Sequence, residues 1–149
     1  MAFLTRISML IGMAVLPLRH IQLTSGFGYR YHPLTGRYAL HEGIDLAARH
    51  DTVFAILAGR VQKEGYHALS GVYIRLDHGQ CQSAYGHLSR LFVLPGDSVK
   101  AGEPIAISGA TGKVTGEHLH FSIQFKNHFI NPLAFLYAII LKPTDHEQF

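Results

Sequence analysis

Two histidines, His118 and His120, lie two positions apart in a run of alternating polar and apolar residues. Alternation over residues 118–125 predicts a half-buried β-strand, because successive side chains of a strand leave on opposite faces. The apolar side chains would then pack into a core, and both imidazoles would project from the other face toward one point in a cleft. Since imidazole nitrogens are common ligands of divalent metals, the pair predicts part of a metal site.

A second pair of candidate ligands, His41 and Asp45, lies in the sequence His-Glu-Gly-Ile-Asp. It does not continue as the helical His-Glu-x-x-His zinc motif, because position 45 is Asp and Gly43 would weaken a helix. In an extended chain, His41, Gly43 and Asp45 would share a face while Ile44 points to the core. A His and an Asp presented in this way are credible ligands of a divalent metal.

A third candidate, His87, lies at the end of a strand predicted over residues 81–87. A period of two places Ser83, Tyr85 and His87 on one face of this strand. We therefore expect Tyr85 beside His87, where it either adds a hydrogen bond to the site or lines a groove as an aromatic side chain. The single cysteine, Cys81, excludes an internal disulfide and a Cys-based zinc cluster, and is expected to be a small buried hydrophobe.

The elements around these residues favour an all-β domain. Of the 149 residues, 48% are hydrophobic and 15% are charged, which is typical of one globular domain. Short apolar runs separated by Gly and Pro predict strands over residues 59–65, 71–77, 81–87 and 104–108, with a hairpin turn at residues 77–80. Residues 24–37 are expected to form a structured loop. Asn131 followed by Pro132 predicts the start of a short apolar helix that ends before Pro143.

The N-terminal region contains a ten-residue apolar run over residues 7–16, after Arg6. This run is too short to span a bilayer, so no transmembrane helix is predicted. It has the length of a signal-peptide core, but no small-x-small cleavage site follows it. Residues 1–13 are therefore interpreted as a signal remnant or the stub of a longer chain, and residues 15–23 as a strand that enters the single domain.

The charge distribution limits the classes of partner. The net charge is +3 and the isoelectric point is about 9.1, but no Lys/Arg cluster or basic helix accompanies it, which argues against nucleic-acid binding. A mildly basic surface would suit an anionic polymer such as a cell wall. The Gly-rich residues 109–116 lack the Lys-Ser/Thr ending of a phosphate-binding loop, which argues against nucleotide binding.

Several short motifs follow one another along the chain: Ser25-Gly26-Phe27-Gly28-Tyr29-Arg30, His41-x-x-x-Asp45, Tyr85-Gly86-His87-Leu88-Ser89, residues 96–103, Thr111-Gly112 and Thr115-Gly116-x-His118-Leu119-His120-Phe121. They occur in the order seen in the lysostaphin/LytM-type zinc metallopeptidases, and the chain resembles this family from about Leu23 to Leu136. The resemblance implies an antiparallel β-sheet core of the sandwich-like, duplicated-hybrid-motif type, with long loops and residues 14–141 as the peptidase core. It also implies peptidoglycan peptides as substrates and a location in the cell envelope, periplasmic or secreted.

The resemblance further implies that His41, Asp45 and His120 hold one Zn²⁺ per chain, and that His87 and His118 are catalytic histidines that do not bind it. Two neutral imidazoles and one carboxylate would leave an open fourth position for water, whose pKa the metal would lower toward about 7. No Glu is placed as in His-Glu-x-x-His enzymes, so a histidine must be the base. We assign His87 to this role and His118 to the oxyanion, although the reverse assignment stays open.

Two other functional classes compete with a peptidase. One is a catalytically inactive LytM-like regulator of another cell-wall hydrolase, but such adaptors usually lack zinc ligands. The other is a lipoyl- or biotinyl-type carrier, suggested by the Gly-flanked residues 96–104, although a carrier has no use for five histidines. The main departure from the family is Ser122, where Glu is usual; this position is not a family ligand. The sequence predicts no oligomeric state.

Overall fold

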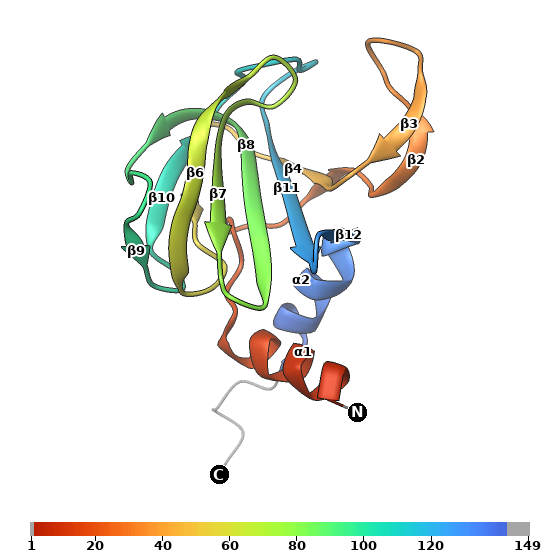
Figure 1. The fold of residues 1–149 in the computed structure, drawn as a ribbon. Helices are drawn as coiled ribbons and strands as arrows, with labels where there is room; N and C mark the ends of the chain where they lie inside the picture. The colour runs from red at the N-terminus through yellow and green to blue at the C-terminus, as the bar shows by residue number, and fades with distance from the viewer. Residues whose placement is uncertain (1, 143–149) are drawn as a thin grey trace.

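The computed structural model describes residues 2–142, and strands form most of it (Figure 1). The central antiparallel sheet has the strand order β1-β4-β11-β8-β7-β6-β9. Its strands are β1 (Leu23–Ser25), β4 (Ile44–Ala47), β6 (Gly59–His67), β7 (Gly71–Asp77), β8 (Cys81–Leu91), β9 (Ser98–Val99) and β11 (His118–Phe125). The predicted strands over residues 59–65, 71–77 and 118–125 are confirmed, as is the mostly β, antiparallel class of the fold.

A second layer closes over one face of this sheet. It contains β5 (Thr52–Phe54) and β10 (Pro104–Ser108), and β10 also pairs with the C-terminal end of β8. The two layers enclose the core, in which Leu119, Phe121 and Ile123 of β11 are fully buried, as their alternation predicted. Burial of each such side chain contributes about 1.5–3 kcal/mol to the free energy of unfolding, so the apolar face of β11 holds its polar face in place.

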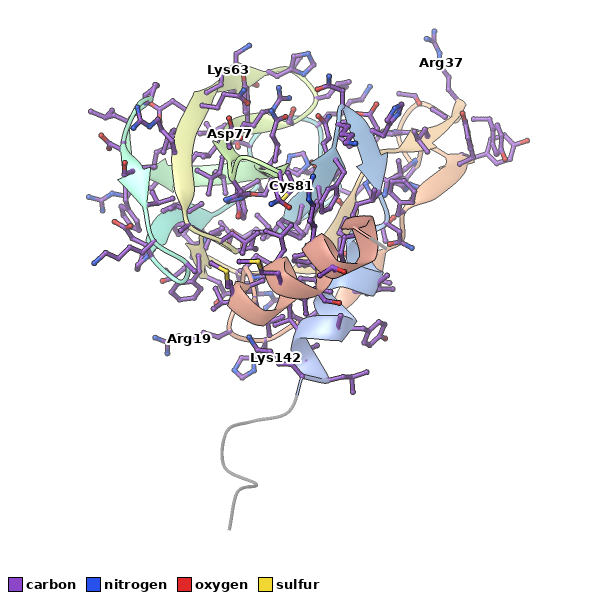
Figure 2. The ribbon with its side chains drawn as sticks, turned by 60° about the horizontal axis from the view of Figure 1, so that its bottom comes forward. Arg19, Arg37, Lys63, Asp77, Cys81 and Lys142 are labelled. Carbon is purple, nitrogen blue, oxygen red and sulfur yellow. The ribbon has the colours of Figure 1, made fainter. Side chains whose placement is uncertain are left out.

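Two helices lie together at one end of the molecule, away from the projecting hairpin of β2 (Gly28–Tyr31) and β3 (Tyr38–His41) (Figures 1 and 2). Helix α2 (Pro132–Ile140) follows β12 (His128–Ile130), and the Asn131 side chain accepts a hydrogen bond from the Leu133 N–H, which confirms the predicted helix start. Helix α1 (Ala2–Met13) was not predicted; it packs against α2. Within residues 2–142, both helices are too short or too polar to cross a membrane.

Two predictions for the N-terminal part are wrong. Residues 15–22 are not a strand; the chain enters irregularly, with the Val15 N–H bonded to the Ile56 carbonyl and the Pro17 carbonyl bonded to the Phe54 N–H. Pro17 has no N–H to donate, so it cannot continue a ladder. Residues 24–37 contain strand β2 rather than loop alone. Its short Gly-Tyr-Arg-Tyr run alternates an exposed tyrosine with an inward side chain, but flanking Gly and Pro obscured the pattern.

Strand β8 contains a β-bulge that decides where two predicted site residues lie. Leu88 pairs with Val72 and Tyr85 pairs with Ile74, so β8 carries one residue more than β7 between the two pairs. His87 lies within this bulge, and its φ of 59° falls in the left-handed region. A bulge reverses the alternation of side chains that follows it. Tyr85 therefore faces the core and is fully buried, whereas the His87 ring lies against His118 and His120, so the prediction that the two share a face is wrong.

The Tyr85 hydroxyl belongs to a buried polar network that joins the two layers. It accepts a hydrogen bond from the Ile56 N–H (3.1 Å) and lies 3.0 Å from the Ser83 hydroxyl, which is 2.7 Å from His78 Nε2. His78 Nδ1–H in turn donates to the Ala58 carbonyl. Because the network fully satisfies the buried N–H of Ile56, Tyr85 has a structural role and contacts none of the candidate ligands.

We expect Tyr85→Phe to lower the free energy of unfolding by about 1–3 kcal/mol, because the buried Ile56 N–H would lose its acceptor. Zinc binding should be unchanged. Urea unfolding and zinc titration by calorimetry measure the two quantities. Tyr66→Phe, at an exposed tyrosine on β6, is the matched control and should change stability by less than about 0.5 kcal/mol. Loss of zinc binding in Tyr85→Phe would mean that Tyr85 contributes to the metal site.

Candidate metal centre

Pairing between β4 and β11 brings the first two candidate ligands together. Asp45 lies directly opposite His120 in this antiparallel pair, and residues in such positions have Cβ atoms about 4.5–5.5 Å apart. The chain reaches β4 from β3 through Glu42 and Gly43. A Cβ atom on Gly43 would lie 2.3 Å from the carbonyl oxygen of Phe121, so only glycine lets the two strands approach this closely. His41, the last residue of β3, then stands beside the pair.

The ligand atoms of His41, Asp45 and His120 form a small triangle. His41 Nε2 lies 3.3 Å from Asp45 Oδ1 and 3.3 Å from His120 Nδ1, and His120 Nδ1 lies 3.0 Å from Asp45 Oδ1. A tetrahedral zinc ion with bonds of about 2.0–2.1 Å requires ligand atoms about 3.3–3.4 Å apart. The three residues therefore fit one face of a zinc tetrahedron and leave the opposite corner open.

Neighbouring groups fix the orientation and charge state of these ligands. His41 Nδ1–H donates to the Gly26 carbonyl (2.7 Å), so Nε2 presents its lone pair to the triangle. Arg30 Nη2 lies 3.8 Å from Asp45 Oδ2 and leaves Oδ1 facing the histidines. Burial opposes ionisation of Asp45, but its hydrogen bonds with His120 and His41 outweigh burial and hold the pKa of Asp45 far below its ordinary value. A carboxylate with two imidazoles at this distance is a ready site for a cation.

His87 lies beside the triangle in a fixed tautomer. Its Nδ1–H donates to the Thr111 carbonyl (2.7 Å), which leaves Nε2 free to accept a proton. Burial lowers the pKa of His87 to about 4, against the effect of the Thr111 hydrogen bond and together with that of the neighbouring His118 and His120. The ring is thus neutral at pH 7, as a general base must be before it acts.

His118 lies next to His87, with the two rings in edge contact. Its ring centroid is 4.6 Å from that of His87, and its Nε2 is 3.5 Å from Asp45 Oδ1. Its Nδ1–H donates to the Gly116 carbonyl (3.1 Å). The structure therefore brings together all five residues expected at the site, with His87 and His118 next to each other beside the triangle, and leaves out only Tyr85.

Thr111 positions His87, a role that no sequence pattern predicted. The Thr111 hydroxyl donates to the Leu88 carbonyl (2.7 Å) and accepts from the Val72 N–H (3.0 Å), so it ties its own backbone to both strands of the bulge. A Cβ atom on Gly71 would lie 2.3–2.5 Å from three atoms of Thr111. The Thr-Gly sequence at positions 111–112 was the one signal of this contact.

A groove of about 320 Å³ extends from His120 across the outer face of the central sheet. It is lined by residues of β11, β8, β7 and β6, together with Glu42 and Phe129. A linear peptide could lie in this groove with one of its bonds beside the triangle.

Comparisons with known proteins agree with this geometry. Residues 39–132 match the family model described as peptidase family M23. The chain is 37% identical over 115 residues to the peptidoglycan DD-endopeptidase ShyB of Vibrio cholerae, which is 75% of this chain and 27% of ShyB. The chain spans about a quarter of the length of the first curated relatives that it matches.

Two solved structures have the same fold. A zinc-containing peptidase from Vibrio cholerae has a TM-score of 0.70 at 36% identity, covering 79% of this chain and 36% of that chain. The catalytic domain of the antimicrobial peptidase lysostaphin from Staphylococcus simulans has a TM-score of 0.69 at 33% identity, covering 78% of this chain and 92% of that domain. The resemblance noted in the sequence is therefore confirmed.

We expect Gly43→Ala to weaken zinc binding by at least about tenfold, because its Cβ would push β4 away from β11 and separate Asp45 from His120. Competition with a chromophoric chelator measures the affinity. Gly116→Ala is the control: a Cβ atom there meets nothing within 4 Å, so zinc affinity should stay at the wild-type value. Wild-type affinity in a folded Gly43→Ala protein would mean that this close approach does not position the ligands.

Proposed function

The chain belongs to peptidase family M23, and we propose that it is a zinc metalloendopeptidase that hydrolyses peptide bonds of peptidoglycan, in stem-peptide crosslinks or cross-bridges. The observation that carries the proposal is the triangle of His41, Asp45 and His120 with two further imidazoles beside it. The name of ShyB, a peptidoglycan DD-endopeptidase, supports the substrate class. An envelope location, periplasmic or secreted, follows from that substrate, and residues 14–141 would form the peptidase core.

In this proposal His41 Nε2, Asp45 Oδ1 and His120 Nδ1 hold one zinc ion per chain. When bound, zinc supplies Lewis acidity, which polarises a peptide carbonyl and lowers the pKa of water. Three protein ligands and an open position are typical of catalytic rather than structural zinc sites. The hydrogen bond from His41 to Gly26 keeps the correct nitrogen directed at the ion.

Of the two imidazoles that do not hold the metal, one would transfer a proton and the other would stabilise the negative charge that develops on the substrate. His87 accepts a proton from the attacking water at Nε2, because its Nδ1–H is held by Thr111 and the ring is neutral. It can then return the proton to the leaving amine. His118 would donate a hydrogen bond from its ring to the oxygen that becomes negative in the tetrahedral intermediate. Its Nε2 lies 3.5 Å from Asp45 Oδ1, which places this ring beside the ligand triangle.

The alternative of an inactive LytM-like regulator makes a different prediction: binding to peptidoglycan without turnover. The complete ligand triangle argues against it, because a regulator has no need to keep three ligands and two more histidines in place. Metal content by mass spectrometry and release of soluble peptides from purified peptidoglycan by the full chain distinguish the two functions.

We expect His120→Ala to lose both zinc and activity, because it removes a ligand. His118→Ala should retain zinc while kcat/KM falls by about a hundredfold or more, because only transition-state stabilisation is lost. Zinc content and turnover are measured on the same samples, with His128→Ala, at an exposed histidine of β12, as control for the loss of an imidazole. Equal loss of zinc in the His118 and His120 variants would refute this division of roles.

A further inference from the structure

We propose that Lys63 and Arg75 form a carboxylate-binding subsite at the end of the groove remote from His120. The subsite would recognise an acidic residue of the bound peptide at a distance from the cleaved bond. The inference rests on the proposed function for the nature of the substrate as a peptide. It assigns to this chain a determinant of specificity that is separate from the metal centre.

The two cations end a continuous row of residues across the outer face of the sheet. Lys63 on β6 pairs with Arg75 on β7, Arg75 pairs with Ala84 on β8, and Ala84 pairs with Ser122 on β11. All four residues line the groove. The row begins with the small side chains of Ser122 and Ala84, which leave room for a peptide backbone, and it ends in two long cationic side chains.

Nothing within the described residues neutralises these two charges. Neither side chain makes a hydrogen bond or an ion pair in residues 2–142. Like charges directly opposite each other on adjacent strands are destabilising, so this pair lowers the stability of the sheet. An anion bound between the two side chains would remove this repulsion. An ionised carboxylate fits a guanidinium and an ammonium group well.

The acidic residues nearby are placed or bonded elsewhere. The Asp77 carboxylate accepts a hydrogen bond from the Gly79 N–H in the turn after β7. Glu64 pairs with Ile74, a core residue, and therefore leaves β6 on the opposite face from Lys63. Glu42 is the one acidic residue among those that line the groove, and it follows the ligand His41 at the other end. The groove is therefore polarised, with its cationic end distant from the metal.

The spacing of the strands determines which residue of the bound peptide the subsite would contact. Arg75 lies two strands away from β11 and one same-face row along from His120, which places the two backbones about 12 Å apart. An extended peptide advances about 3.4 Å per residue, so the recognised carboxylate lies about three or four residues from the cleaved bond. A contact so far from the reacting atoms is equally strong in the ground and transition states, and therefore changes KM rather than kcat.

The test uses two stem-peptide dimers of peptidoglycan that differ only in whether their acidic residues carry free or amidated carboxylates. We expect the zinc-loaded full chain to cleave the free-carboxylate dimer with a KM about tenfold lower. The double variant Lys63→Gln/Arg75→Gln should lose this preference while kcat stays within about twofold of wild type. Raising NaCl to about 0.5 M should reduce the wild-type preference. Circular dichroism and zinc content verify that the variants are folded and loaded.

Arg60→Gln is the matched control, since Arg60 is an exposed cation on the same strand that does not line the groove. It should keep the full preference. If the double variant still prefers the free carboxylate, or if Arg60→Gln loses the preference equally, the subsite is refuted and only the general charge of the surface acts.

A binding measurement separates this inference from the proposed function. Fluorescence anisotropy of the same two peptides, labelled and bound to the zinc-loaded His118→Ala protein, does not depend on turnover. Tighter binding of the free-carboxylate peptide, abolished by Lys63→Gln/Arg75→Gln, would support the subsite even if wild type cleaved neither dimer, in which case the proposed function alone would fail. Equal binding of the two peptides would refute the subsite, whether or not the dimers are cleaved.

Discussion

The register between β4 and β11 is the constraint on which the site depends. It sets Asp45 opposite His120, so a carboxylate oxygen and an imidazole nitrogen from residues 75 positions apart lie 3.0 Å from each other. A slip of one residue would turn one of these side chains into the core and a core residue outward. The buried faces of both strands oppose such a slip, since either Ile44 and Leu46 of β4 or Leu119 and Phe121 of β11 would lose their burial. The hydrophobic core therefore enforces the geometry of the metal centre.

The bulge in β8 gives His87 an orientation that a regular strand could not. Regular alternation would direct His87 into the core beside Tyr85, but one extra residue turns it toward the ligands. The left-handed backbone at His87 is uncommon for a residue other than glycine, and such a conformation persists only where its surroundings hold it. Thr111 supplies that support through three hydrogen bonds. The catalytic proposal thus relies on an irregularity as much as on the sheet.

Much of the site could be predicted from the sequence, because its signals are local. The alternation around His118 and His120 indicated both the strand and its ligand face, and Asn131-Pro132 marked the start of α2. Tyr85 was misplaced because a period of two cannot reveal a bulge, which is set by pairing with β7. The roles of Arg30, Thr111 and the Lys63–Arg75 pair were also missed, since each depends on a partner more than ten positions away. The predictions that failed depended on contacts between residues distant in the chain, not on the chemistry of single residues.

The place of β11 in the sheet has a consequence for how the protein is made. This strand is inserted between β4 and β8, both of which precede it by many residues in the chain. During synthesis β4 and β8 leave the ribosome before β11. The edges that pair with β11 therefore remain unpaired, and can pair wrongly, until β11 has been made. Such non-local pairing is slow, because the entropy of closing a long loop is lost before the contacts form. Asp45 therefore has no His120 opposite it until β11 has left the ribosome.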